Sequence, residues 1–323
     1  MKKASAVSTA SLAESVRQGG HRAIARAISA IENREAGADR LIQELFPSTG
    51  RATLVGVTGA PGTGKSSLVN RLAAHYRAQG KSVGIIAVDP TSPFTGGALL
   101  GDRIRMQQHA TDDGIYIRSM ATRGFLGGLA RATGDAVLVL DAAGKDLILI
   151  ETVGVGQDEV DIVRLADATL LLLVSGMGDD VQSFKAGVME IADLFVINKA
   201  DRGDTGRLEQ ELKVMLGLSQ RQDGWRPPVV KTVATEGTGV AELAAALDDY
   251  LAHLERGGLR EEKRVERWRQ RLVDLIRQQA LERVLKTGVG KEGLDNYARQ
   301  IQRRERDPYS VVQELLRSAG ITE

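Results

Sequence analysis

The chain has 323 residues, 42% of them hydrophobic, so it can bury a full core as one large or two modest domains. Lys and Arg number 43 against 42 Asp and Glu, a balance that gives no field drawing the protein to nucleic acid or an anionic membrane. The absence of cysteine excludes disulfides, thiolate zinc sites, iron–sulfur clusters and a cysteine nucleophile. The N-terminus lacks a signal peptide's apolar core and the longest apolar run cannot span a bilayer, so we expect a cytoplasmic protein.

The N-terminal part, residues 1–48, is predicted to be helical. Ile24, Ala27, Ile28 and Ile31 recur at helical spacing, with Arg and Glu on the opposite face. We therefore expect an amphipathic helical segment ahead of the main domain.

Residues 49–256 alternate between short apolar runs and helix-length segments. In chain order the runs read ATLVGVTG, SVGIIAVDP, DAVLVL, DLILIE, ATLLLLV, DLFVIN and PPVVKTVA. Nearly unbroken apolar strands of this kind are typical of a parallel sheet that helices cover on both faces. The sequence therefore predicts an α/β domain with a mainly parallel sheet.

The C-terminal part, residues 257–323, is mostly charged and is also predicted to be helical. Val265, Trp268, Leu272 and Ile276 lie near helical spacing, and no segment there reads as a strand. Such an apolar stripe must meet either the main domain or a second subunit.

The segment GAPGTGKSS fits the pattern G-x-x-x-x-G-K-[ST] of a phosphate-binding loop. Glycines let backbone N–H groups turn toward phosphate oxygens, Lys65 brings charge to the outer phosphates, and the Ser66 hydroxyl suits Mg²⁺. The strand before the motif and the helix after it favour a nucleoside polyphosphate site, in a P-loop NTPase, over a chance glycine-rich turn. The residues assigned to phosphate binding are Gly59, Ala60, Pro61, Gly62, Thr63, Gly64, Lys65, Ser66 and Ser67.

Guanine is predicted from FVINKAD, where an N-K-x-D pattern follows an apolar run. The Asp201 carboxylate can accept hydrogen bonds from guanine N1–H and the 2-amino group, which adenine lacks. A weaker signal, KTVATEGTG, lies where GTPases place a backbone N–H that faces guanine O6. The residues assigned to the base are Asn198, Lys199, Asp201, Val233, Ala234 and Thr235, and the predicted nucleotide is GTP or GDP.

The residues for metal binding and hydrolysis depart from the common pattern. DLILIETVGVGQDEV reads as a Walker B strand and a switch, but its acidic residue is Glu151, whose longer side chain still reaches a Mg²⁺-bound water. Gly154 is the glycine whose N–H would meet the γ-phosphate. Val155 follows it where Ras-like GTPases have a water-orienting glutamine, and Gln157 comes only two residues later. Hydrolysis by the isolated protein is therefore expected to be slow.

Seven segments occur in the order seen in one GTPase family: GAPGTGKSS, AVDPTSP, GDRIRM, RSMATRGFLGGLA, ETVGVGQDEV, GMGDDVQSFKAG and INKAD. The chain resembles the MeaB/ArgK-type GTPases, the G-protein chaperones of methylmalonyl-CoA mutase, strongly over residues 20–260 and more loosely beyond. The resemblance implies a GTP hydrolase that gates cofactor loading and protects an adenosylcobalamin-dependent acyl-CoA mutase. One alternative is an ArgK-type kinase or transport-associated ATPase, which the guanine motif disfavours. Another is a metal-delivery GTPase, which the lack of cysteine disfavours.

The resemblance also implies roles for single residues. The metal ligands would be Ser66, Asp89, Asp102 and Glu151, and the catalytic residues would be Lys65, Asp102, Glu151 and Gly154. The coupling residues of the switches would be Arg105, Asp179, Asp180, Gln182 and Lys185. The resemblance further implies a homodimer formed through the C-terminal helices, and a cobalamin adenosyltransferase is a further candidate partner. We can assign no role to RSMATRG.

Overall fold

A computed structural model describes residues 9–89, 112–121, 128–152, 165–176, 192–218, 221–287 and 293–321. The chain divides into two compact units, Met1–Arg260 and Glu261–Glu323, and each is described by itself. The division of the chain at residues 48 and 256 stays a prediction.

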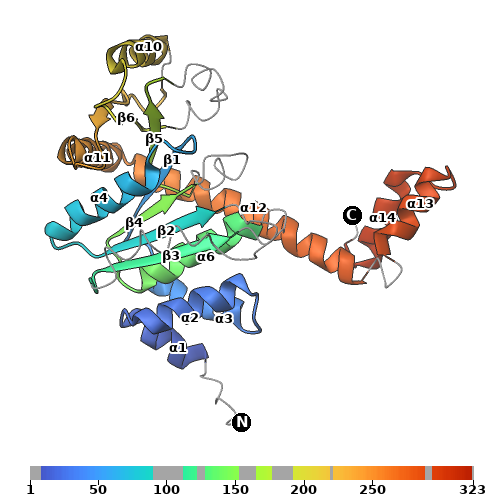
Figure 1. The fold of residues 1–323 in the computed structure, drawn as a ribbon. Coiled ribbons are helices and arrows are strands. Elements are labelled where there is room, and N and C mark those ends of the chain that lie inside the picture. The colour runs from blue at the N-terminus through green and yellow to red at the C-terminus, as the bar shows by residue number, and fades with distance from the viewer. Residues whose placement is uncertain are drawn as a thin grey trace. The chain divides into compact units, whose positions relative to one another are not determined.

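The first unit is built on one sheet, whose seven described strands run in the order β3-β2-β4-β1-β5-β6-β7 with parallel pairings (Figure 1). The strands are β1 Thr53–Gly59, β2 Val83–Asp89, β3 Ile115–Ala121, β4 Leu147–Glu151, β5 Ala168–Val174, β6 Leu194–Asn198 and β7 Val229–Thr232. The predicted α/β class with a parallel sheet is therefore confirmed. In such a sheet the carboxyl ends of all strands meet at one edge, where ligands bind.

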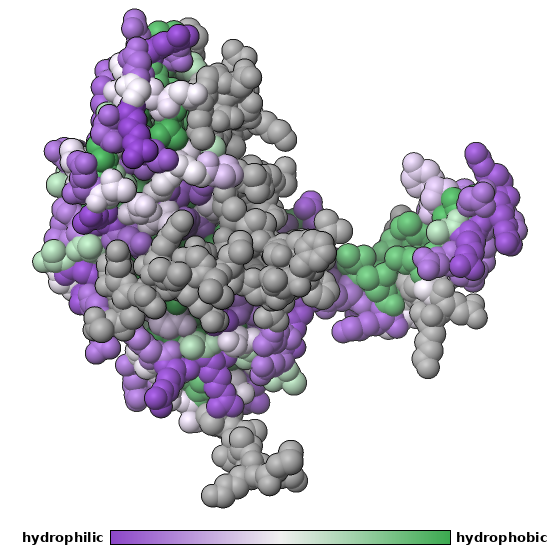
Figure 2. Space-filling model, viewed as in Figure 1, coloured by the Kyte–Doolittle hydropathy of each residue, from purple (hydrophilic) through white to green (hydrophobic). Residues whose placement is uncertain are grey.

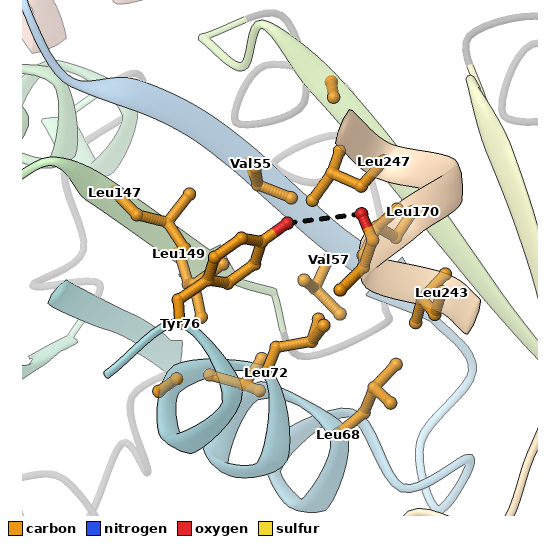
Figure 3. Packing of buried hydrophobic residues seen from close by; sticks show 14 of the residues in the cluster. Val55, Val57, Leu68, Leu72, Tyr76, Leu147, Leu149, Leu170, Leu243 and Leu247 are labelled. Atoms are coloured by element: carbon orange, nitrogen blue, oxygen red, sulfur yellow. Dashed lines mark hydrogen bonds between the residues drawn. The ribbon is translucent and has the colours of Figure 1, made fainter. Parts of the chain in front are cut away.

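One face of the sheet is covered by α4 (Lys65–Ala78) and α11 (Val240–Arg256). Figure 3 shows Leu68, Leu72 and Tyr76, spaced four residues apart along α4, packed toward the strands. All three are buried, as residues four apart on one helix face are when that face meets a core. The Tyr76 hydroxyl donates to Asp248 on α11 at 3.0 Å, which joins the two helices.

The opposite face is covered by α6 (Gly128–Ala142) and the N-terminal helices α1 (Thr9–Arg17), α2 (His21–Glu32) and α3 (Ala38–Leu45). Ile24, Ala27, Ile28 and Ile31 of α2 are all buried in this cluster, as their spacing predicted. At the β5–β6 side, α10 (Thr205–Leu218) buries Leu208 and Leu212 against the sheet.

One predicted strand is wrong and one strand was missed. The run DAVLVL, residues 135–140, lies inside α6 instead of the sheet. Its apolar residues are buried between the sheet and the N-terminal helices. A helix that is buried on most sides lacks the one-sided apolar spacing of an amphipathic helix, so its sequence resembles that of a buried strand. The missed strand, β3, has the sequence IYIRSMA, in which polar residues interrupt the apolar run because β3 is an edge strand.

Three aspartates link neighbouring strands by hydrogen bonds at the edge of the sheet where the strands begin, opposite their carboxyl ends. Each directly precedes a strand and accepts a backbone N–H from the adjoining segment: Asp146 from Ser82 at 2.7 Å, Asp167 from Leu54 at 3.0 Å and Asp193 from Thr169 at 2.9 Å. Asp141, in the last turn of α6, accepts from three more N–H groups, those of Gly50, Arg51 and Ala52. These carboxylates fix where the strands begin, because a buried backbone N–H needs an acceptor.

The second unit is helical, with most of α12 (Leu259–Thr287), and with α13 (Gly293–Gln302) and α14 (Pro308–Ser318). None of the residues of α12 is buried, and Figure 2 shows apolar side chains gathered on this unit. The large apolar side chains exposed along α12 are Val265, Trp268, Leu272, Val273, Ile276, Leu281 and Leu285. Although α12 has 29 residues, no helix in the described ranges is both long enough and apolar enough to cross a membrane.

Candidate functional site

The predicted phosphate loop joins β1, which ends at Gly59, to α4, which begins at Lys65. It therefore lies at the carboxyl edge of the sheet. Gly59, Gly62 and Gly64 have φ values of 146°, 80° and 94°, a region that side-chain-bearing residues rarely adopt. A Cβ atom on Gly59 would also lie 2.4 Å from the Leu172 carbonyl oxygen of β5. The glycines thus allow both the turn of the loop and its close packing on the sheet.

The ammonium group of Lys65 lies within this loop. Its Nζ donates to the carbonyl oxygens of Gly59 at 2.7 Å and Ala60 at 3.0 Å, and the residue is only 6% exposed. The N-terminal N–H groups of α4 and the Lys65 charge therefore come together at one place. A phosphate group there would meet both.

Ser66 and Glu151 come together from the start of α4 and the end of β4. The Ser66 hydroxyl donates to Glu151 Oε1 at 2.5 Å. A hydroxyl and a carboxylate oxygen beside a phosphate loop are a donor set that suits Mg²⁺, which takes few protein ligands and completes its shell with water and phosphate oxygens. Among the described residues there is no group of three or more His, Asp or Glu side chains that could hold a metal ion.

Asp89 is the last residue of β2, on the strand next to Glu151, and the structure describes its backbone only. The other predicted metal, switch and hydrolysis residues lie outside the described residues: Asp102, Arg105, Gly154, Asp179, Asp180, Gln182 and Lys185. The roles of all eight residues stay predictions.

Asn198, at the end of β6, joins the guanine motif to the phosphate loop. Its Nδ2 donates to the Thr63 carbonyl oxygen at 2.7 Å. Its Oδ1 accepts from the Ala234 N–H at 3.1 Å and the Thr232 hydroxyl at 3.0 Å. The residue is 2% exposed, so its side-chain amide is buried and hydrogen-bonded at both ends. The phosphate loop, the guanine motif and the segment around Ala234, which were predicted separately, thus come together at the Asn198 side chain.

Lys199 and Asp201 follow directly. Lys199 has a φ of 54°, and its Nζ donates to the Gly62 carbonyl oxygen at 2.8 Å, so its side chain reaches back to the phosphate loop. The Asp201 side chain is 41% exposed and pairs with Arg202 at 3.3 Å. An exposed pair of this kind is weak, so a ligand can replace it with little loss of stability.

The loop after β7 contains Val233, Ala234 and Thr235 as predicted base contacts. The Val233 N–H donates to the Thr238 carbonyl oxygen at 3.0 Å, which closes the loop into a turn. Sequence reasoning missed Arg71 on α4, whose guanidinium donates to the carbonyl oxygens of Ala234 and Thr235. No motif includes Arg71, and an arginine on a helix carries no signal of its own.

Comparison with known proteins agrees with this geometry. The family model described as "Methylmalonyl Co-A mutase-associated GTPase MeaB" matches residues 24–289. A protein of Pyrococcus abyssi, named as a candidate GTPase, is 49% identical over 309 residues and covers 95% of each chain. The GTPase ArgK of Escherichia coli is 36% identical over 307 residues, with 91% of each chain covered.

Two further similarities bear on function. A protein of Caenorhabditis elegans named as the mitochondrial methylmalonic aciduria type A homolog is 34% identical, covering 78% of this chain and 68% of the relative. Among solved structures, a LAO/AO transport system kinase superposes with a TM-score of 0.73 at 25% identity, covering 97% of this chain and 98% of that one.

Proposed function

The chain belongs to the MeaB family of GTPases, and from this premise we propose that it gates cofactor loading and protects an adenosylcobalamin-dependent acyl-CoA mutase. Its reaction is hydrolysis of GTP to GDP and phosphate. The observation that carries the assignment of the site is Asn198, whose amide joins the phosphate loop to the guanine motif. The family description and the name of the Caenorhabditis elegans relative support a mutase as the client.

In the proposed site, the loop from Gly59 to Ser67 wraps the phosphates while Lys65 neutralises charge on the outer two. Asp201 reads N1–H and the 2-amino group of the base, and the Lys199 side chain lies along the ring. Mg²⁺ would be held by Ser66 and Glu151 with Asp89 and Asp102, and it would neutralise part of the phosphate charge.

Hydrolysis needs a water molecule oriented toward the γ-phosphate, and the chain has Val155 where a glutamine would do this. An aliphatic side chain neither accepts a proton nor holds the nucleophile. We therefore assign the protein a timing role, in which the client orders the switches through the segment with Asp179, Asp180, Gln182 and Lys185 and thereby speeds hydrolysis.

The proposal includes a homodimer formed through the second unit. Its support is the apolar stripe of α12, where Leu272 and Ile276 are 57% and 66% exposed. Side chains of this size along one helix form a patch of the kind that marks a protein interface.

A second function, transfer of phosphate to a protein or small molecule, has the LAO/AO transport system kinase as its support. The two functions differ in nucleotide and in acceptor. The kinase reading predicts ATP use and a phosphorylated product, whereas the chaperone reading predicts GTP use and release of inorganic phosphate.

The test is the rate of phosphate release from GTP, with and without a purified adenosylcobalamin-dependent mutase. We expect slow turnover alone and faster turnover with the mutase, and Lys185→Ala should keep the slow rate but lose the stimulation. Lys65→Ala serves as the inactive control. Fast turnover without a client, or equal use of ATP and GTP, would contradict the proposal.

A further inference from the structure

Arg71 connects the helix of the phosphate loop to the loop of the base. It lies on α4 six residues after Lys65, about 9 Å along the helix axis. Its Nε donates to the Ala234 carbonyl oxygen at 3.1 Å and its Nη2 to the Thr235 carbonyl oxygen at 2.5 Å. Neither the phosphate loop nor the guanine motif includes this residue.

These contacts fix the peptide groups around Ala234 on both sides. The Ala234 N–H donates to Asn198, and the Ala234 carbonyl oxygen accepts from Arg71. Because a trans peptide is planar, the Thr235 N–H points in the direction opposite to the Ala234 carbonyl, away from the guanidinium. Within the described part of the chain, no residue accepts a hydrogen bond from this N–H.

We propose that Arg71 is a positioning residue for guanine recognition, which holds the backbone N–H of Thr235 in the orientation that binds O6 of the base. The proposal rests on the guanine site assigned above. An arginine suits the task because its rigid fork binds two oxygens at once, whereas a lysine is a single point charge. Arg71 is exposed, so its removal leaves no buried charge and the protein should still fold.

Two nucleotide analogues separate the contacts to the base. ITP lacks the 2-amino group that Asp201 binds in the proposed site but keeps O6. In 6-thio-GTP a sulfur atom, a weaker acceptor, replaces O6, while N1–H and the 2-amino group remain. The ratio of GTP to ITP affinity therefore reports on Asp201, and the ratio of GTP to 6-thio-GTP affinity reports on the loop that Arg71 holds.

The experiment measures the affinities of the three nucleotides for the full chain and three variants. Arg71→Met should reduce the preference for GTP over 6-thio-GTP about threefold to tenfold, the worth of roughly one hydrogen bond. The preference for GTP over ITP should be unchanged. Arg71→Lys should show a smaller loss. Arg207→Met, which removes an exposed arginine paired with Glu211 on α10, is the matched control and should show none.

The outcomes separate this proposal from the one it rests on. If the unaltered protein does not prefer GTP to ITP, the guanine site itself is wrong, and the role of Arg71 is overturned with it. A second outcome is that the unaltered protein prefers GTP to ITP while Arg71→Met has the same preference for GTP over 6-thio-GTP as the unaltered protein. In that case the guanine site stands and Arg71 does not position the loop. An equal loss in Arg207→Met would also overturn the proposal.

Discussion

The side-chain amide of Asn198 donates to the carbonyl oxygen of Thr63 at 2.7 Å, across 135 residues of sequence. This contact places the guanine motif directly against the phosphate loop. Gly64 lies beside it, since a Cβ atom there would be 2.4 Å from Asn198 Nδ2. One buried amide therefore sets the distance between the proposed sites for phosphate and base.

Asn198→Asp should weaken GTP binding by at least about tenfold. The substitution replaces the Nδ2 donor with an oxygen that faces the Thr63 carbonyl oxygen, and it places a charge in a site that is 2% exposed. At low pH a protonated carboxyl can donate again, so part of the affinity should return. Equilibrium binding of a fluorescent GTP analogue at several pH values measures both effects. Asn33→Asp, at the exposed end of α2, should leave the affinity unchanged.

Glu151→Gln should raise the Mg²⁺ concentration needed for half-maximal turnover and leave Mg²⁺-free GDP binding nearly intact. A neutral amide still accepts the hydrogen bond from Ser66 but loses the negative charge that attracts a divalent cation. The measurement is GTP turnover over a Mg²⁺ titration. An unchanged Mg²⁺ requirement would remove Glu151 from the proposed metal site.

Asp141→Ala should destabilise the first unit by about 2–4 kcal/mol, because the backbone N–H groups of three residues lose the carboxylate that accepts their hydrogen bonds. Asp141→Asn should cost less, since the amide keeps one oxygen. Urea unfolding of both variants measures the difference. Asp274→Ala on the surface of α12 should change the free energy of unfolding by less than about 0.5 kcal/mol. Equal effects of the Ala and Asn variants would show that Asp141 does not act through these bonds.

Lys145 links stability to pH at the amino edge of the sheet. Burial lowers the pKa of its ammonium group below the ordinary value of 10.5, with the nearby Arg77 charge acting in the same direction. Between the lowered pKa and 10.5 the unfolded chain therefore binds more protons than the folded one, so this group's contribution to stability rises with pH. The free energy of unfolding relative to Lys145→Met should increase as pH rises toward 10.5. A flat difference across alkaline pH would contradict this.

Much of the fold and of the candidate site could be predicted because the relevant signals are local. The phosphate loop needs glycines at positive φ, and this requirement leaves a pattern of spaced glycines that the structure matches at Gly59 and Gly64. A strand buried on both faces, such as β5, reads as a continuous apolar run. The same rule gave a wrong strand prediction for residues 135–140. A helix enclosed by a sheet and other helices also has a continuous apolar sequence.

What the sequence could not predict depends on contacts between distant segments. Arg71 and Thr235 are 164 residues apart, and only the packing of α4 beside the β7 loop brings them together. The aspartates that precede β4, β5 and β6 also could not be predicted. In the sequence such a carboxylate looks like any acidic residue of a loop, and only the structure shows that it accepts a backbone N–H. Such residues have no local pattern, so they appear only when the register of the strands is known.

Gly64→Ala and Gly80→Ala form a matched pair that separates backbone strain from the contact with Asn198. Both glycines have positive φ, 94° and 83°, so alanine at either position should cost about 1–2 kcal/mol of stability. A Cβ atom on Gly80 meets nothing within 4 Å, whereas one on Gly64 would lie 2.4 Å from Asn198 Nδ2. Only Gly64→Ala should therefore displace Asn198 from Thr63.

We expect Gly80→Ala to keep its GTP affinity despite the lower stability, and Gly64→Ala to lose at least about tenfold because the phosphate loop and guanine motif can no longer pack together. Thermal unfolding and GTP binding on the same samples distinguish the two effects. Equal affinity of the two variants would mean that the Asn198 contact does not set the geometry of the nucleotide site.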